Sequence, residues 1–461
     1  MFIGRTKELD NMNSRYEGGQ FECAIIYGRR RVGKTTLINE FVKDKPTIYY
    51  TGVEGNANEN LEGLSTSIYS YRAERTDISV SFTDFNQALS AAFEIVKKER
   101  IVFVIDEFPY LAESYDAVSS ILQTLIDRNK DTSKMFLILC GSSLSFMENQ
   151  VLGYESPLYG RRTCQYKIAP FTFFEMKDAL KGWKPEDRAV VYGITGGIPL
   201  YLSFLNEKLS LKDNIKNAFL NTSAYLFEEP TNLIKQECRD PAQYNSVIRA
   251  IAKGASKMSV ISSKTSIGTA HVSGILGKLI SIGILKKETP FGEGSSRKTI
   301  YLIDDSMFRF WYRFIPDNMS AIGRGLADNV YDTIQPHVSD FMGSVFEEIC
   351  KQYLWEQLRS GDVPIAFNDL GRWWGNDPQN KKETEIDIMG ESDQNSAIFA
   401  ECKWRNEKVD VGVLDSLVER TTLFHYTKTW LYLFSKTGFT SGCVEKAKAF
   451  GNVNLVKFIE M

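Results

Sequence analysis

Residues 28–35 read GRRRVGKT and match the pattern Gly-x4-Gly-Lys-[Ser/Thr]. The apolar stretch FECAIIYG (21–28) precedes this pattern and is short enough for a buried strand. The stretch TTLINEFVKD (35–44) follows it and carries apolar residues at helical spacing. A strand, a glycine-rich loop and a helix in this order predict a loop whose backbone N–H groups bind nucleotide phosphates.

Each polar position of this loop has an expected role. Gly28 and Gly33 let the backbone approach the phosphates, because neither carries a Cβ. Lys34 is expected to reach the β- and γ-phosphates, and the Thr35 hydroxyl is expected to bind Mg²⁺. Arg31 and Thr36 are expected to line the same nucleotide site. The run of three arginines at 29–31 would raise anion affinity, but it could equally contact an acidic partner or nucleic acid.

Length and composition bound the remaining possibilities. A chain of 461 residues predicts two to four domains, and 43% hydrophobic with 25% charged residues is typical of a globular protein. We expect no membrane span and no signal peptide. The seven cysteines form no C-x-x-C pair and the three histidines are far apart, which argues against structural zinc and favours the cytoplasm. A net charge of −3 means that any nucleic-acid surface must be local.

Two further apolar runs end in polar residues. The run IVFVIDE (101–107) predicts a buried parallel strand that ends in two carboxylates. Asp106 is suited to hold Mg²⁺, directly or through water, and Glu107 is suited to orient or deprotonate the attacking water. The run MFLILC (135–140) is followed by Gly141-Ser142-Ser143, where either serine could also cap a helix.

Taken together, the motifs resemble a known family. These are FIGR-x-x-EL (2–9), GRRRVGKT, IDEFPYL (105–111), CGSSLSFM (140–147), SPLYGRRT (156–163) and GGIP (196–199). In this order they resemble the archaeal-type ATPases of the STAND group of AAA-like switch ATPases, over about residues 1–235. The resemblance implies ATP as the nucleotide.

The resemblance also implies roles for individual residues. Phe2, Gly4 and Arg5 would line the adenine pocket, and Pro199 would cap the base from a helical lid. Ser142 and Ser143 would be placed to sense the γ-phosphate, at the end of a strand between the two nucleotide strands. Arg161 and Arg162 would act as arginine fingers, in cis or from a neighbouring subunit, or form a solvated basic pair. Because an arginine finger from a neighbouring subunit requires a second copy of the chain, self-association is one of the expected interactions.

The segment from about 241 to 305 is locally basic, with nine Lys/Arg against four acidic residues. Its pattern predicts helices near 244–254 and 257–265 and a third helix capped by Thr269, followed by two strand-like runs around a glycine-rich tip. This is the order of a winged helix. Its third helix would offer His271, Ser273 and Lys278 to a DNA major groove. Such a domain could instead serve as a lid or a protein-binding module.

After a predicted linker at 316–329, the last segment carries a possible metal site. An amphipathic helix (341–358) precedes strand-like runs at 365–375, 383–390 and 397–404. Asp387, Glu401 and Lys403 have the spacing D-x13-E-x-K. Two carboxylates could bind Mg²⁺ or Mn²⁺, the lysine could polarise the attacking water, and Glu347 could add to the site.

This segment resembles the PD-(D/E)xK nuclease core, in the form appended to these ATPases as a C-terminal extension of once unknown function (DUF234). Isoleucine precedes Asp387 where the family usually has proline. A non-cleaving core and an ordinary strand pair with surface charges stay open as alternatives.

The expected fold class is therefore α/β. A P-loop NTPase parallel sheet with a helical lid (1–235) is followed by a winged helix (236–315) and a small α/β restriction-endonuclease-like domain (316–461). The expected function is an ATP-hydrolysing switch that controls a tail that contacts DNA and cleaves it with the help of a metal ion. The alternative is a regulatory ATPase whose inactive tail binds protein or nucleic acid.

Overall fold

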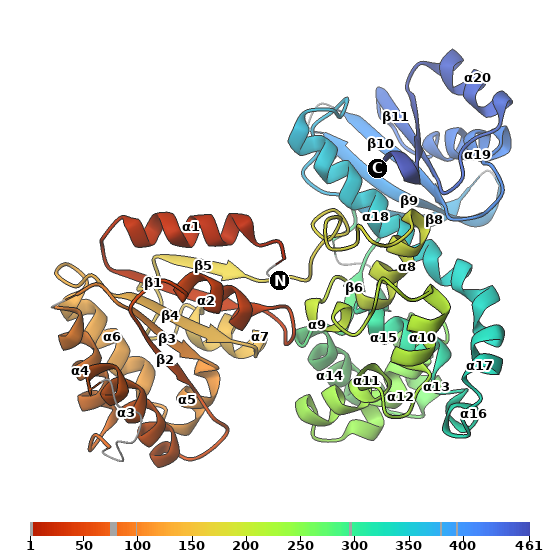
Figure 1. Cartoon of the computed structure of the whole chain (residues 1–461). Helices are drawn as coiled ribbons and strands as arrows, with labels where there is room; N and C mark the ends of the chain where they lie inside the picture. Colours follow the sequence, from red (N-terminus) through yellow and green to blue (C-terminus); the bar gives the residue numbers. More distant parts are fainter. Residues whose placement is uncertain (1–2, 74–80, 98, 295–296, 379, 393–394) are drawn as a thin grey trace. The chain divides into compact units, whose positions relative to one another are not determined.

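A computed structural model describes residues 3–461 apart from 74–80, 98, 295–296, 379 and 393–394 (Figure 1). The chain separates into two compact units. The first contains Met1–Phe171 with Ile198–Leu200, and the second contains Thr172–Gly197 with Tyr201–Met461. The helices between 201 and 235, expected as part of the ATPase segment, thus group with the C-terminal part of the chain.

The first unit is built on a parallel five-stranded sheet in the order β2-β3-β4-β1-β5. The strands are β1 (Glu22–Tyr27), β2 (Thr47–Thr51), β3 (Val102–Asp106), β4 (Phe136–Gly141) and β5 (Cys164–Lys167). The three predicted strands are present, and β4 lies between β1 and β3 as expected. Because the strands are parallel, the segments that follow β1, β3 and β4 meet at one edge of the sheet.

Helices cover both faces of this sheet. One core contains Ile25, Phe103 and Leu137, while Ala24, Val104 and Ile138 belong to a second core. This alternation is the period of two that a strand buried on both faces requires. The helices are α1 (Thr6–Glu17), α2 (Lys34–Val42), α3 (Ala57–Ala73), α4 (Phe85–Val96), α5 (Phe108–Ser114), α6 (Val118–Asn129) and α7 (Leu144–Phe146), with a π-helical turn at Met147–Val151.

The second unit begins with helices that pack on one another. They are α8 (Pro185–Thr195), α10 (Leu211–Phe219), α11 (Tyr225–Glu237) and α15 (Ser306–Phe314), while the short α9 (Pro199–Leu202) spans the boundary between the units. The aromatic face of α15 anchors them: Trp311 donates its indole N–H to the carbonyl oxygen of Phe227, and Phe310 packs edge-on against Phe219.

Between α11 and α15 lie three helices and a two-stranded antiparallel ribbon. They are α12 (Pro241–Ala252), α13 (Met258–Thr265), α14 (Thr269–Ser281), β6 (Leu285–Glu288) and β7 (Ile300–Ile303). The predicted apolar face of α14 is buried, and His271 and Ser273 are exposed. The predicted cap was wrong by one residue, since Gly268 occupies the N-cap position and Thr269 is the first helical residue.

The predicted linker at 316–329 was also wrong. It folds into α16 (Met319–Gly323) and the start of α17 (Ala327–Ile334), followed by a 3₁₀ turn at Gln335–His337. Ile322 and Val330 are buried, so two apolar anchors outweigh the polar and glycine-rich composition. Ion pairs from Lys212 and Lys216 of α10 to Asp328 add to the contact.

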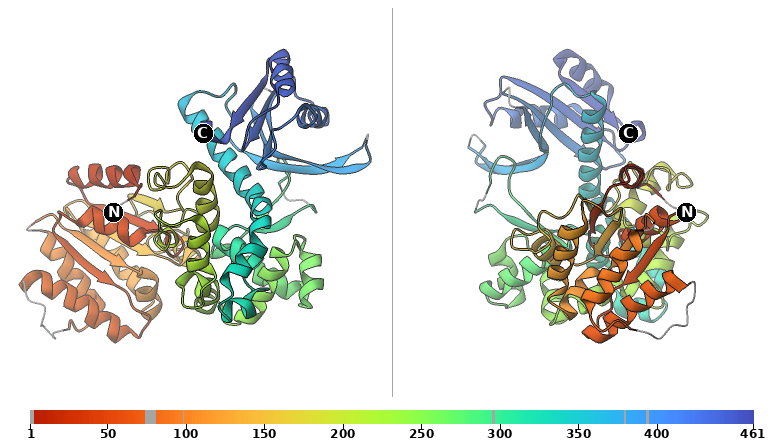
Figure 2. Two further views of the ribbon diagram at one scale, coloured as in Figure 1. Left: turned by 45° about the vertical axis from the view of Figure 1, so that its right-hand side comes forward. Right: turned by 90° about the vertical axis from the view of Figure 1, so that its left-hand side faces the viewer.

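The C-terminal part of the second unit is a mixed sheet in the order β12-β11-β10-β9-β8 (Figure 2). Its strands are β8 (Gly371–Asp377), β9 (Lys382–Ser392), β10 (Ser396–Lys403), β11 (Lys428–Ser435) and β12 (Val453–Lys457), with β8–β10 antiparallel and β10–β12 parallel. The predicted helix is α18 (Val338–Ser360). One face of the sheet packs on α19 (Val411–Thr421) and α20 (Ser441–Phe450). A 3₁₀ turn at Phe458–Glu460 follows β12.

Across the residues given above, no helix combines the length and the apolar composition that crossing a membrane requires.

Candidate functional site

The loop between β1 and α2 is tightly constrained at both glycines. A Cβ on Gly28 would lie 2.2 Å from the carbonyl oxygen of Ile168, a contact that no side chain can make. Gly33 has φ +91°, a conformation that L-residues rarely adopt. The loop therefore needs glycine at these two positions, as the motif predicts.

Lys34 points back into the loop from the start of α2. Its Nζ donates to the carbonyl oxygens of Gly28 at 2.9 Å and Arg29 at 3.0 Å. The side chain is 6% exposed, and this burial lowers the pKa of Lys34. A buried ammonium held by carbonyl dipoles can exchange these partners for phosphate oxygens without large movement.

Asp106 lies at the end of β3 and joins the first turn of α2. Its Oδ2 accepts from the Thr35 hydroxyl at 3.0 Å and from the Tyr49 hydroxyl at 2.8 Å, and its Oδ1 accepts from the Glu107 N–H at 2.9 Å. Burial and the Asp106 charge raise the pKa of Tyr49. A hydroxyl and a carboxylate are hard oxygen ligands, so Thr35 and Asp106 fit a magnesium ion. Tyr49 on β2 was not predicted, because no motif marks it.

Glu107 and Ser142 are brought together by the neighbouring strands β3 and β4. The Glu107 Oε2 accepts from the Ser142 hydroxyl at 2.9 Å and from the Ser142 N–H at 3.2 Å. Glu107 itself has φ 46°, in the left-handed region that is uncommon for a non-glycine residue. Ser143 is exposed at the N-cap of α7, but its side chain makes no capping hydrogen bond.

Three predicted adenine-pocket residues lie beside this loop. The Arg5 guanidinium stacks over the Phe171 ring at 4.2 Å from its centroid, and its Nη2 donates to the carbonyl oxygen of Val32 at 3.4 Å. A Cβ on Gly4 would meet Phe171 at 2.6 Å. On the other side, a Cβ on Gly33 would lie 3.8 Å from Cγ of Pro199. Phe2 lies outside the described residues.

The remaining predicted loop residues have clear positions. Arg31 has φ +74° within the loop, and Thr36 is exposed in the first turn of α2. Arg30 donates to the Tyr110 hydroxyl at 2.9 Å, which ties the loop to α5.

Arg161 and Arg162 are not brought to the loop within this chain. They precede β5, and the next residue, Thr163, donates its N–H to Cys23 near the start of β1, at 2.9 Å. The loop begins five residues further along β1, roughly 16 Å away at the rise of a strand. Arg161 pairs with Asp127 at 3.0 Å, and the Arg162 guanidinium lies 5.8 Å from the Tyr159 ring centroid.

The structure gathers the D-x13-E-x-K residues at β9 and β10. The Glu401 Oε1 pairs with Lys403 Nζ at 2.6 Å. The Asp387 Oδ2 accepts from the Cys402 N–H at 2.8 Å. Arg420 of α19, which the sequence did not predict, donates to Glu401 Oε2 at 2.6 Å and to the carbonyl oxygen of Glu385 at 2.9 Å. Both oxygens of Glu401 thus have a cationic partner.

Electrostatics mark the same cluster. Burial and the nearby Glu401 and Glu347 carboxylates raise the pKa of Asp387 to about 7. Burial also raises the pKa of Glu347 on α18. Burial opposes the charged form of Lys403, but Glu401 and Asp387 outweigh it and raise the pKa of Lys403. Within the ranges that the structure covers, no three His, Cys, Asp or Glu side chains are arranged to hold a metal ion, so the expected second metal is not supported.

Comparison with known proteins matches two regions of the chain to family models. A family model described as an ATPase domain predominantly from Archaea matches residues 2–205, and one described as archaeal and bacterial proteins of unknown function matches residues 311–413. The uncharacterized protein MJECL04 of Methanocaldococcus jannaschii is 33% identical over 410 residues, 88% of each chain. The uncharacterized ATP-binding protein MJ0423 of the same organism is 42% identical over 45 residues, 10% of this chain and 76% of that one.

Among solved structures, the Walker-type ATPase PABY2304 of Pyrococcus abyssi is similar in fold. Its TM-score is 0.51 at 17% identity, over 68% of this chain and 96% of that chain. The ATPase match, the C-terminal match and the near full-length relative together show that the chain belongs to the archaeal-type ATPase family in which the ATPase domain is followed by this C-terminal domain.

Proposed function

We propose that the chain hydrolyses ATP and uses the nucleotide state as a switch of the STAND type. The observation that carries this proposal is the pair of contacts at the ends of β3 and β4. Asp106 already holds the Thr35 hydroxyl, and Glu107 already holds Ser142. The candidates for metal binding (Asp106), water activation (Glu107) and phosphate sensing (Ser142) thus lie at the ends of two adjacent strands.

The roles follow from these positions. Thr35 and Asp106 would hold Mg²⁺, which supplies charge neutralisation on the phosphates. Lys34 binds the β- and γ-phosphates, and Glu107 orients and deprotonates the water. Gly4 and Arg5, together with Phe2, would bind the base, and Pro199 would cap it.

Phosphate release from ATP by wild type and Lys34→Ala tests hydrolysis. If wild type with Mg²⁺ and DNA releases no more phosphate than the variant, the proposal is wrong.

Arg161 and Arg162 are proposed to act in trans. Their place near the opposite end of β1 from the loop supports action on a neighbouring copy's nucleotide. Phosphate release per subunit should then rise with protein concentration and lose that rise in Arg162→Ala. A rate per subunit that is constant in a monodisperse monomer would contradict the trans role.

For the C-terminal domain we propose metal-dependent cleavage of DNA. The supporting observation is that Asp387, in the middle of β9, lies beside Glu401 and Lys403 at the C-terminal end of the neighbouring strand β10. Mg²⁺ or Mn²⁺ would be held by the two carboxylates and would stabilise charge on the phosphate, while Lys403 polarises the attacking water. We propose that the segment 241–303 is a winged helix that contacts the same DNA, supported by its element order and its basic charge.

One observation favours the alternative of a binding-only domain. Arg420 and Lys403 together occupy both oxygens of Glu401, and a divalent ion would have to displace Arg420. The chain would then be a regulatory ATPase with an inactive nuclease-like domain.

Plasmid and single-stranded DNA incubated with Mn²⁺ or Mg²⁺, with and without ATP, separate these functions. Cleavage by wild type that Lys403→Ala abolishes supports the nuclease. Identical behaviour of the two proteins under every condition supports the binding-only domain.

All seven cysteines are unpaired, which supports the proposed cytoplasmic location.

A further inference from the structure

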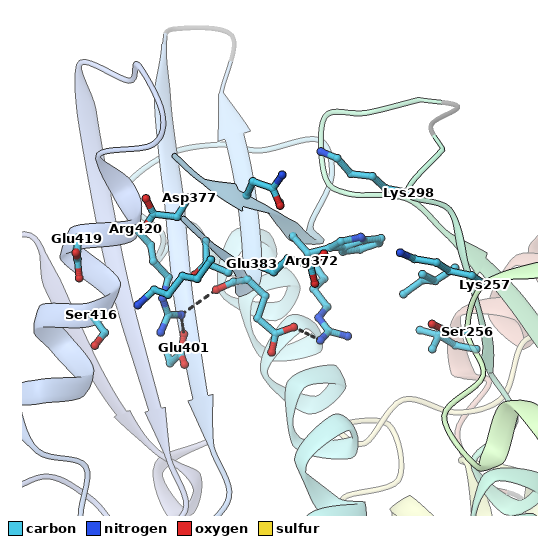
Figure 3. A pocket seen from close by; sticks show the side chains of 18 of the residues that line it. Ser256, Lys257, Lys298, Arg372, Asp377, Glu383, Glu401, Ser416, Glu419 and Arg420 are labelled. Atoms are coloured by element: carbon cyan, nitrogen blue, oxygen red, sulfur yellow. Dashed lines mark hydrogen bonds and ion pairs between the residues drawn. The ribbon is translucent and has the colours of Figure 1, made fainter. Parts of the chain in front are cut away.

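The second unit contains a cavity of about 900 Å³ that includes Glu401 of the D-x13-E-x-K motif but extends well beyond that motif (Figure 3). One wall comes from the segment between α12 and α13, which includes Ser256 and Lys257, and from β7 with Lys298 just before it. The opposite wall comes from β8, β9, β10 and α19. Two segments far apart in sequence thus build one cavity.

The cavity reaches the proposed cleavage site. Glu401 and Arg420, whose side chains are joined by an ion pair of 2.6 Å, both line it. Figure 3 shows this pair on the side away from Lys257 and Lys298. A ligand in the cavity would therefore contact basic side chains at one end and the Glu401 cluster at the other.

Trp374 gives the cavity an aromatic surface. The neighbouring Trp373 packs into the apolar core with its ring 4.9 Å from the Phe424 ring. Successive residues of a strand point to opposite faces, so Trp374 faces away from that core, and it lines the cavity half-buried. An indole ring held at this position can stack on a planar base.

The lining carries both acidic and basic side chains, but the wall formed by residues 254–302 contributes only basic ones. On the sheet side, Arg372 pairs with Glu385 and Arg420 pairs with Glu401, and Asp377, Glu383 and Glu419 also line the cavity. Lys257 and Lys298 are exposed, and Figure 3 shows their ammonium groups directed toward the cavity. The Lys298 ammonium pairs with Glu293 at 2.7 Å, so a phosphate would take the place of that carboxylate. Both lysines can reach backbone phosphates on that side.

We propose that this cavity binds an unpaired strand of nucleic acid and leads it to the Asp387–Glu401–Lys403 cluster. Lys257 and Lys298 contact the phosphates, and Trp374 stacks on a base. A volume of about 900 Å³ is that of a small-ligand site, so a double helix, which is wider than its own major groove of about 12 Å, does not enter. The proposal rests on the proposed nuclease function for its purpose, but its binding step stands alone.

Binding to the full-length protein is measured by fluorescence anisotropy in EDTA, which prevents cleavage. The probes are a 5′-labelled oligothymidine and a labelled blunt hairpin. We expect tighter binding of the unpaired strand by wild type. Trp374→Leu keeps apolar bulk but removes stacking, and should weaken that binding by roughly 5- to 150-fold. Trp374→Phe should retain most of it.

Salt dependence isolates the phosphate contacts. Lys257→Ala combined with Lys298→Ala should reduce the slope of log K against log salt by about 1.4, at about 0.7 for each lost contact. The control Lys448→Ala removes an exposed lysine of α20 that does not line the cavity, and should change nothing. Thermal melting of each variant shows whether it is folded.

Three outcomes would overturn the proposal. They are tighter binding of the hairpin, equal affinity of folded Trp374→Leu and wild type, or an unchanged salt slope in the double lysine variant. Failure of cleavage is distinguishable, because wild type that binds the strand in this way but never cleaves it retains the cavity assignment and loses only the nuclease.

Discussion

Glu107→Gln tests the assignment of the catalytic base most directly. In the structure one oxygen, Oε2, accepts both hydrogen bonds from Ser142, at 2.9 Å and 3.2 Å. The glutamine amide oxygen can accept both bonds in the same place. The substitution therefore removes the charge and the basicity of residue 107 while it keeps the shape of the site.

The expected loss follows from this geometry. A positioned general base contributes about 10²- to 10⁴-fold, so phosphate release should fall by that factor, or about 3–5 kcal/mol of barrier. ATP affinity should be retained, because Thr35, Asp106 and Lys34 are untouched. Replacing two charge-assisted hydrogen bonds by neutral ones costs stability on the order of 1 kcal/mol, so the melting temperature should fall by a few degrees.

Single-turnover phosphate release and binding of a fluorescent ATP analogue measure the two effects separately. Glu113→Gln is the matched control, since Glu113 is an exposed glutamate on α5 next to the site. Phosphate release by Glu107→Gln at a rate close to that of the control, with ATP bound, would refute the role of Glu107.

Three other substitutions probe the two sites. Tyr49→Phe removes a bond to Asp106 and should raise the Mg²⁺ concentration for half-maximal phosphate release by about 10-fold or more; an unchanged titration would exclude a positioning role. Gly28→Ala places a Cβ 2.2 Å from a carbonyl oxygen and should destabilise the unit by about 1–3 kcal/mol and abolish tight ATP binding. Gly343→Ala, where a Cβ meets no atom within 4 Å, is its control, and equal melting temperatures would contradict the clash. Asp387→Asn in EDTA should raise the melting temperature most above pH 7, less at pH 5 and hardly below pH 4: the raised pKa of about 7 means that the folded state keeps the Asp387 proton, so the wild type loses stability as pH rises from about 4 to 7, and a pH-independent difference would be inconsistent with it.

The nucleotide site was largely predictable because its residues belong to contiguous motifs. Gly28, Lys34 and Thr35 are neighbours in sequence, and Asp106 and Glu107 end an apolar strand. The role of Tyr49 could not be predicted, because its contact with Asp106 depends on β2 lying beside β3, which the local sequence does not specify.

The C-terminal domain shows the same limit. The spacing of Asp387, Glu401 and Lys403 identified two neighbouring strands, but Arg420 reaches Glu401 from a helix that follows β10 in sequence. The 316–329 segment was misjudged because the burial of Ile322 and Val330, rather than composition, makes it helical.

The backbone geometry around the phosphate-binding loop affects how stable the protein is without its nucleotide. Of the six non-glycine residues with positive φ in the ranges that the structure covers, Arg5, Arg31 and Glu107 surround the phosphate loop. Such conformations cost on the order of 1 kcal/mol or more each. The native state thus carries backbone strain at the candidate ATP site, and a ligand that binds only this state raises the free energy of unfolding by mass action. ATP would then stabilise the folded protein, and in a cell depleted of ATP this protein would be degraded by proteases sooner.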